Sequence, residues 1–296
     1  MNYELTIKRL RSLLKTIVRI FLLFILSALL ALVIRLFLCN FYAVPSDSME
    51  PAILPGDFIL TDKWTYGARI FTRFQFDENS DPPMVRFSGF RKIRRNDVIV
   101  FNFPYRHNWG IIRMSLENIF VKRCIGLPGD SVSIEGGYYH IAGLSEVVGN
   151  RDEQKKLAVY QGELPKSIER TFPYDSVLNW NIRNFGPLYI PAVGKTIPLT
   201  LENFKLFHRM IVYETNADVQ EKDSAVYING ELAMNYTFRS NWYFVAGDKV
   251  MNSQDSRYFG LIPEAYIIGR ATIVLTSKDD YSGKRRWNRT LKRIEN

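Results

Sequence analysis

Two short segments decide this chain: Pro45-Ser46-Asp47-Ser48-Met49-Glu50-Pro51 and, about seventy residues later, Val121-Lys122-Arg123-Cys124-Ile125-Gly126-Leu127-Pro128-Gly129-Asp130. The first offers a serine on a turn just beyond an apolar N-terminal run, and the second offers a lysine at the end of an apolar strand. A serine hydroxyl is a poor nucleophile that needs an adjacent base. Each segment alone is also typical of an ordinary turn or a solvent-facing lysine. Their position beside the apolar run favours a serine nucleophile, Ser48, and a lysine base, Lys122, held close to a bilayer.

Lys122 is a useful base only if its surroundings lower its pKa. An ordinary lysine has a pKa of about 10.4, so near pH 7 roughly one molecule in 10³ carries a neutral amine. Burial among apolar groups lowers a lysine pKa by about 3–5 units. The neighbours Phe120, Val121 and Ile125 are suited to supply that burial, and the cation Arg123 acts in the same direction. Desolvation alone is therefore large enough to make the amine reactive.

The N-terminal segment predicts a membrane anchor. An apolar run over residues 20–34 continues past Arg35 to residue 39, which gives the roughly 20 residues that cross a bilayer. Five cations precede or begin it: Lys8, Arg9, Arg11, Lys15 and Arg19. By the positive-inside rule they keep residues 1–15 in the cytoplasm, so residues 16–39 span the plasma (inner) membrane once and the rest is exported. The bulky end of the run disfavours a cleavable signal peptide, whose cleavage site has small residues.

The exported part, residues 40–277, predicts a mainly β catalytic domain. Short β-rich runs bounded by Gly, Pro, Asp or Asn mark its strands, and they cover residues 57–61, 98–103, 131–134, 266–269 and 271–275. Residues 225–232 predict a hairpin around an Asn-Gly type I′ turn. Helical periodicity is convincing only in the anchor. Residues 140–222, charged and poor in strands, predict a large inserted subdomain, and residues 278–296 form a basic tail.

Composition and the placement of charge limit the classes of partner that the protein is expected to bind. A net charge of +9 suits either nucleic acid or an anionic membrane surface. Because the charges flank an anchor and no recognition motif occurs, we expect membrane lipid and no nucleic acid as a partner. Basic clusters in residues 91–95 and 284–293 are interpreted as solvated or headgroup-touching segments. We expect no metal, cofactor or disulfide frame, because the histidines and cysteines are scattered singly: they are His107, His140, His208, Cys39 and Cys124.

Four blocks, in order, resemble the motifs of type I signal peptidases, the membrane-anchored serine proteases that release exported proteins from their signal peptides. Two of them are the segments quoted above. The others are Gly56-Asp57-Phe58-Ile59-Leu60-Thr61-Asp62-Lys63 and Gly247-Asp248-Lys249-Val250-Met251-Asn252-Ser253-Gln254-Asp255-Ser256-Arg257-Tyr258-Phe259-Gly260, the last extending through Ile262-Pro263-Glu264 to Gly269-Arg270-Ala271. The blocks cover about a third of the chain. Their order and the leading anchor argue against a chance match.

The resemblance implies a role for each matching residue. Ser48 matches the nucleophile and Lys122 the general base. Ser46 matches the position whose hydroxyl helps the Ser48 backbone N–H hold the oxyanion, and Ser253 matches a serine that orients the lysine. Charged residues that support the site match four further positions: the ion pair Asp255 and Arg257, and the structural residues Arg123 and Asp248.

Three positions depart from the family's pattern. Asp47 replaces a common glycine between the two serines, Ala52 stands where threonine is usual, and Lys249 stands where the family's Gly-Asp-Asn has asparagine. None of them is Ser48 or Lys122, so the resemblance still implies activity. Asp47 adds a carboxylate one residue from the nucleophile, and its effect is left open, as is that of Lys249.

The resemblance implies a mainly β core and a Ser/Lys endopeptidase that cuts signal peptides from exported precursors through an acyl-enzyme, after small residues and without a cofactor. An extended substrate would add as a strand beside the chain leading to Ser48. Two alternatives stay open. One is another Ser/Lys protease, such as a self-cleaving repressor or a pilus-maturation peptidase. The other is a catalytically inactive homologue that serves as a membrane-anchored envelope scaffold or precursor-binding protein.

Overall fold

The computed structural model describes residues 2–73, 80–279 and 282–295. Helices are α1 Asn2–Val33, η1 (a π-helix) Ile34–Leu38, α2 Arg151–Val159, α3 Lys166–Glu169, α4 Leu201–Thr215, α5 Ser256–Phe259, and the 3₁₀ turns η2 Glu264–Tyr266 and η3 Trp287–Arg289. Strands are β1 Cys39–Ala43, β2 Asp57–Asp62, β3 Arg69–Phe71, β4 Met84–Arg86, β5 Val98–Asn102, β6 Ile119–Gly126, β7 Ser131–Glu135, β8 Tyr138–Ile141, β9 Phe185–Tyr189, β10 Thr196–Pro198, β11 Val219–Lys222, β12 Ala225–Ile228, β13 Glu231–Leu232, β14 Asn235–Thr237, β15 Trp242–Ala246, β16 Ile262–Pro263, β17 Ile267–Ser277 and β18 Lys292–Arg293. The domain is mainly β, as expected.

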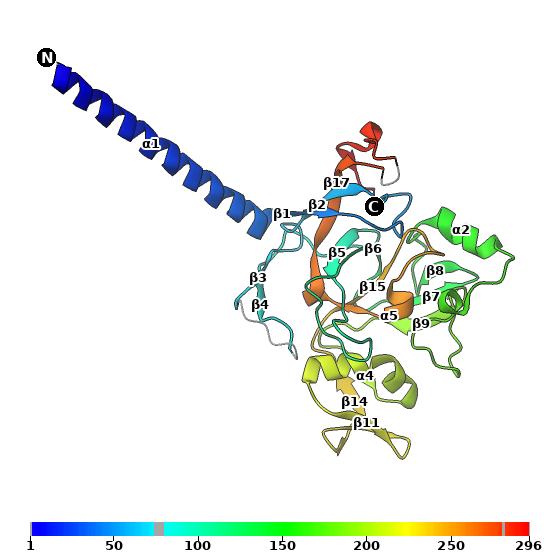
Figure 1. The fold of residues 1–296 in the computed structure, drawn as a ribbon. Helices are drawn as coiled ribbons and strands as arrows, with labels where there is room; N and C mark the ends of the chain where they lie inside the picture. The colour runs from blue at the N-terminus through cyan, green and yellow to red at the C-terminus, as the bar shows by residue number, and fades with distance from the viewer. Residues whose placement is uncertain (1, 74–79, 280–281, 296) are drawn as a thin grey trace.

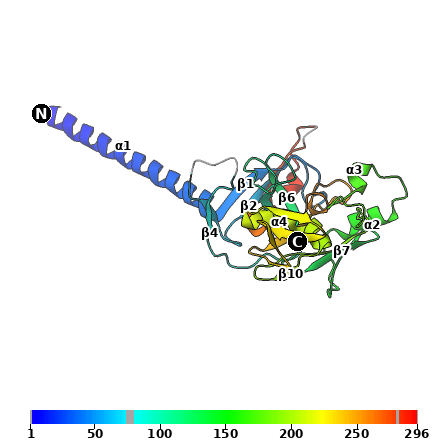
Figure 2. The ribbon, with the colours of Figure 1, turned by 90° about the horizontal axis from the view of Figure 1, so that it is seen from below.

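The N-terminal helix stands apart from the β domain. Figures 1 and 2 show α1 projecting from the body in both views, with its C-terminal end beside β1. The helical stretch Ile7–Leu38 is long and apolar enough to cross a membrane, and none of its most apolar window is buried against the domain. A helix that is apolar all round and unburied in protein is suited to lipid rather than water. The chain is therefore membrane-anchored by its N-terminal helix.

A central antiparallel sheet carries the domain. Its strands follow the order β1-β2-β17-β5-β6-β15-β16, and β18 pairs with β17. The two late strands expected from the sequence are one strand, β17, which runs through Arg270 and bends at bulges between Ile267 and Gly269 and between Ala271 and Ile273. Bulges bend a strand and increase its twist, which lets β17 pair with both β2 and β5.

Hydrophobic side chains pack on both faces of the sheet. Along β5, Ile99 and Phe101 belong to the larger buried cluster, whereas Val98 and Val100 belong to a smaller one, as the two-residue period of a strand requires. The larger cluster also takes in Leu157 of the inserted region 140–222. That region thus packs against the same core as β5 rather than around a separate one.

The inserted region also contains helix that the sequence interpretation missed. The expectation of helical periodicity only in the anchor was wrong: α4 buries four apolar residues, Leu206, Phe207, Met210 and Ile211, on one face. The Thr200 side chain caps it by accepting a hydrogen bond from the Asn203 backbone N–H. By contrast, the Asn229-Gly230 hairpin is confirmed, because both residues have positive φ as a type I′ turn requires.

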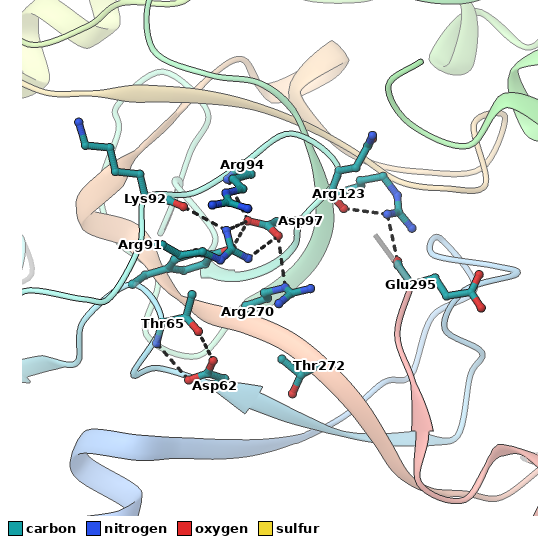
Figure 3. Close-up of polar contacts among 12 residues, drawn as sticks. Asp62, Thr65, Arg91, Lys92, Arg94, Asp97, Arg123, Arg270, Thr272 and Glu295 are labelled. Carbon is teal, nitrogen blue, oxygen red and sulfur yellow. Dashed lines mark hydrogen bonds and ion pairs between the residues drawn. The ribbon is translucent and has the colours of Figure 1, made fainter. Parts of the chain in front are cut away.

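The basic clusters are less solvated than expected. Arg91 makes two hydrogen bonds of 2.8 Å to the buried carboxylate of Asp97, which Arg270 also approaches (Figure 3). In the tail, Arg289 is buried and forms an ion pair with Asp57 at the start of β2. The ion pair of Arg289 therefore attaches the tail to the sheet, although Trp287 is exposed.

Candidate active site

The turn that follows β1 presents Ser48. Glu50 N–H donates to the Asp47 carbonyl at 2.9 Å, and Ile53 N–H to the Met49 carbonyl at 2.9 Å. The Met49 and Ile53 side chains are fully buried in the smaller core cluster. These apolar anchors hold the turn against the sheet while the Ser48 hydroxyl faces the other way, toward β6.

Lys122 meets that hydroxyl from the middle of β6. Its amine donates a hydrogen bond of 2.6 Å to Ser48 Oγ, and the two residues are only 4% and 8% exposed. The expectation that Lys122 lies at a strand end was wrong, because it pairs with Ile99 of β5 and the strand continues to Gly126. Burial lowers the pKa of Lys122 to about 8, with the Asp255 carboxylate opposing that change.

A fully buried ion pair lies behind the lysine. Arg257 Nη2 is 2.7 Å from Asp255 Oδ2, and both side chains are 0% exposed. Asp255 also accepts from Gly247 N–H at 2.9 Å, and Arg257 donates to the Val250 carbonyl at 2.8 Å. Burial pushes the pKa of Asp255 upward, but Arg257 outweighs it, so the pKa lies below the ordinary value. The pair thus locks the segment after β15 in place as two opposite charges.

Arg123 and Asp248 make a second clamp on the opposite side of β6. Arg123 donates to both Asp248 oxygens, at 2.6 and 2.7 Å. It also donates to the carbonyls of Asn96 and Glu295, the latter drawn in Figure 3. These contacts fix β6 next to Lys122 without touching its amine.

The two remaining serines differ in their surroundings. Ser46 Oγ lies 3.4 Å from Ser48 Oγ at the part-buried rim. The Ser253 hydroxyl is buried and completes no hydrogen bond among the described residues, although it lies near enough to Asp255 to help lower the pKa of that carboxyl. Its orienting role toward Lys122 stays a prediction.

Gly247 is the site residue that the sequence interpretation missed. A Cβ atom there would lie 2.1 Å from Ser253 Oγ and 2.5 Å from the Ser48 carbonyl oxygen. Both distances are far below van der Waals contact, so only glycine lets the segment after β15 approach the nucleophile turn this closely. The signal was present in the Gly-Asp pair of the last motif block, but its meaning depends on the fold.

The two charged departures from the family's pattern contact one another. Lys249 Nζ lies 2.5 Å from Asp47 Oδ2 and 2.8 Å from Glu50 Oε2. Asn252 donates to Asp47 as well, at 3.0 Å. The hydrogen bond that Lys249 donates to Asp47 lowers the pKa of Asp47 and raises the pKa of Lys249. Asp47 and Lys249 thus form a bridge from the nucleophile turn to the turn after β15. The backbone carbonyl of the third departure, Ala52, accepts a hydrogen bond from the Arg289 guanidinium.

A cleft of about 620 Å³ opens onto the Ser48–Lys122 contact. One side is formed by residues 42–49, from β1 and the nucleophile turn, and the other by residues 117–122. Each side includes strand, the end of β1 on one side and the first half of β6 on the other, so an extended peptide could lie between them. Among the described residues, no group of three or more His, Cys, Asp or Glu side chains is placed to hold a metal ion.

Fold and site together define a membrane-anchored, mainly β protein with a candidate serine–lysine site beside an open cleft. The sequence model of the family described as "Signal peptidase, peptidase S26" matches residues 17–276. The chain therefore belongs to the signal peptidase family, which makes it a peptidase and confirms the resemblance to type I signal peptidases.

Curated relatives agree. The chain is 28% identical over 247 residues to a signal peptidase I of Buchnera aphidicola subsp. Acyrthosiphon pisum, covering 83% of this chain and 71% of that one. It is 27% identical over 274 residues to a signal peptidase I of Aquifex aeolicus, covering 91% and 85%. A crystal structure of a signal peptidase I from Enterococcus faecalis V583 matches with 22% identity and a TM-score of 0.30, covering 62% of this chain and 98% of that one.

Proposed function

We propose that this chain removes N-terminal signal peptides from exported precursor proteins, with Ser48 as nucleophile and Lys122 as general base. The observation that carries the proposal is the 2.6 Å hydrogen bond between Lys122 Nζ and Ser48 Oγ at the edge of the cleft. A pKa of about 8 leaves roughly one lysine in ten neutral at pH 7, against about one in 10³ for an ordinary lysine. Burial therefore supplies about a hundredfold more of the reactive form.

Each step follows from this contact. Neutral Lys122 takes the proton from Ser48 Oγ as the oxygen attacks the scissile carbonyl, which gives a tetrahedral oxyanion. Collapse breaks the C–N bond, and Lys122 returns its proton to the leaving amine. Lys122 then takes a proton from water, the resulting hydroxide attacks the acyl ester, and Ser48 leaves with the proton. No other proton acceptor is required.

In the proposed mechanism two further serines assist the Ser48–Lys122 dyad. The Ser46 hydroxyl and the Ser48 backbone N–H hold the oxyanion, and losing one such donor typically costs about 2.7–4 kcal/mol of barrier. Ser253 orients the Lys122 amine. The ion pairs Asp255–Arg257 and Arg123–Asp248 do not touch substrate and keep the surrounding strands in register.

The membrane location of the enzyme favours its encounter with signal peptides. In the proposal residues 1–15 are cytoplasmic, residues 16–39 span the membrane, and the catalytic domain, residues 40–277 with the insertion at 140–222, lies on the exported side, followed by the tail, residues 278–296. Signal peptides are themselves held in the bilayer, so anchoring raises the effective concentration of both reactants. Precursors with small residues before the cut enter the cleft as an extended strand.

Cleavage of a purified precursor with an Ala-x-Ala site tests the dyad in detergent. Wild type should cut at that site, and Ser48→Ala and Lys122→Ala should each abolish cutting. Ser88→Ala and Lys92→Ala, exposed residues of the same types outside the cleft lining, are the matched controls and should cut normally. Full cleavage by Ser48→Ala would refute the mechanism, and a folded wild type that cuts nothing would favour the inactive scaffold.

A further inference from the structure

A second pair of cations, one buried and one part-buried, lies away from the Ser48–Lys122 contact, where the anchor helix joins the β domain. Lys63, directly after β2, and Arg69, the first residue of β3, line a cavity of about 280 Å³. Asn40 and Tyr42 of β1 line it as well. Figure 1 shows β3 beside the end of α1. Apart from Tyr42, which also lines the catalytic cleft, these groups have no part in the proposed peptidase mechanism.

Both cations donate their hydrogen bonds to neutral oxygens. Lys63 is 6% exposed, and its amine donates to the Arg35 carbonyl at 2.7 Å. Arg69 donates to the Ala265 carbonyl at 2.7 Å and to Asn102 Oδ1 at 2.8 Å. Within residues 2–73, 80–279 and 282–295, no carboxylate forms an ion pair with either cation.

This absence contrasts with the rest of the domain. The three buried arginines elsewhere, Arg123, Arg257 and Arg289, each form an ion pair with an aspartate. A buried charge without a counter-charge is costly, so buried cations are normally paired. Among the residues that the structure describes, the chain follows that rule at these three arginines, and the buried cations without an ion pair are Lys122, which the active site uses, and Lys63 at the junction.

The cations at the junction also repel each other. Burial lowers the pKa of Lys63 to about 8, and the neighbouring charges of Arg69 and Arg35 act in the same direction. Burial likewise lowers the pKa of Arg69 to about 9, helped by Arg86. An anion in the cavity would relieve both costs at once. A purely structural role for Lys63, holding the Arg35 carbonyl, would require no such cluster.

We propose that this cavity binds the phosphate of an anionic phospholipid headgroup. Asn40 in the cavity lining comes two residues after the end of the apolar helical stretch Ile7–Leu38 and directly after the proposed span, residues 16–39, so the cavity would lie at the depth of the headgroups. A phosphate diester offers acceptor oxygens to an ammonium, a guanidinium and the polar tips of Asn40 and Tyr42. The site would fix the angle at which the catalytic domain meets the membrane, and so goes beyond the proposed peptidase activity.

Thermal unfolding of the full chain in nanodiscs tests the proposal. Discs of phosphatidylcholine alone are compared with discs that also contain phosphatidylglycerol, for wild type, Lys63→Met and Lys63→Arg. Wild type should melt about 3 °C higher in the anionic discs, the size of shift expected for a ligand well above its dissociation constant. Lys63→Met should lose this difference and Lys63→Arg should keep most of it. General destabilisation by Lys63→Met lowers both melting temperatures and does not remove their difference.

Lys92→Met is the matched control, since it removes an exposed cation outside the cavity. It should keep the full difference between the two discs, because it only weakens general attraction to an anionic surface. The proposal fails if Lys63→Met keeps the difference, or if Lys92→Met loses as much of it. If inorganic phosphate stabilises wild type equally in phosphatidylcholine discs and Lys63→Met removes that effect, the site takes free phosphate and the lipid assignment is overturned.

Discussion

Two ion pairs flank the Ser48–Lys122 contact and differ in almost every respect. Asp255–Arg257 lies behind the lysine, is fully buried and matches the family's pattern. Asp47–Lys249 lies beside the serine, has side chains about one third exposed, and arises from two departures from that pattern. One pair is part of the interior and the other a bridge across the rim of the cleft.

The difference teaches that a charge pair's burial decides what it contributes. Removing one partner of a buried pair leaves an uncompensated charge and typically costs about 3–5 kcal/mol. An exposed pair typically contributes about 0–1 kcal/mol to stability. A carboxylate one residue from a nucleophile nevertheless acts on the titration of the catalytic base. The buried pair should therefore govern folding, and the exposed pair the pH dependence of cleavage.

The largest expected effect is that of Arg257→Met. It leaves Asp255 buried without its partner and should lower the free energy of unfolding by about 3–5 kcal/mol, measured by urea denaturation. Asp255→Asn combined with Arg257→Met removes both charges and should recover part of that loss. If Arg257→Met unfolds at the wild-type urea concentration, the pair is not a structural element and the contrast with Asp47–Lys249 collapses.

Next in size is the pH dependence of wild-type cleavage. The base must be neutral, so kcat/KM should fall tenfold per pH unit below the Lys122 pKa of about 8. At pH 6 the rate should be about a hundredfold below its plateau. The lowered pKa of Lys122 also makes the stability of the fold depend on pH. Because the folded pKa lies below the unfolded one, the unfolded chain binds more protons between about pH 8 and 10.5, so the free energy of unfolding rises with pH in that range. A rate that is flat from pH 6 to 9 would contradict a lysine base.

The parts of the site that could be predicted from the sequence are those carried by short segments. The turn at Ser48 and the strand at Lys122 are each indicated by their own neighbours, whereas the proposed roles of the two residues come from the resemblance to a family. The Asn229-Gly230 hairpin was predictable for the same reason, since two adjacent residues determine the turn.

What could not be predicted depends on partners far apart in the chain. Asp47 and Lys249 are 202 positions apart, and Asp57 and Arg289 are 232 apart. Nothing in either local sequence indicates the other partner. The sequence interpretation therefore treated Asp47 and Lys249 as two unrelated departures, and placed Arg289 in a solvated or headgroup-touching tail. Helix α4 was missed although its buried residues Leu206, Phe207, Met210 and Ile211 recur at helical spacing, because it lies within a region that was interpreted as a charged, strand-poor insertion.

The smallest expected effect is the change in the pH dependence of cleavage when the charge of Asp47 or Lys249 is removed. It is also the sharpest test of the comparison between the two ion pairs. Lys249→Asn leaves Asp47 and Glu50 unpaired, and their negative field favours the charged form of Lys122. The acid limb of kcat/KM should therefore move up by about 0.5 pH unit, the size of one charge acting over roughly 10 Å through a mixed protein–water medium. Asp47→Asn should move it down by a similar amount. Both shifts should shrink at high salt.

The double variant Asp47→Asn/Lys249→Asn decides whether the two residues act as a pair. It restores the net charge of the wild-type rim, because Glu50 alone remains, so its acid limb should return to the wild-type pH. Stability in urea should change by less than about 1 kcal/mol in all three variants. If the double variant keeps the shift of Lys249→Asn, Asp47 does not act on Lys122. If each variant instead unfolds as readily as Arg257→Met, the exposed bridge is structural after all, and the two ion pairs differ only in where they lie.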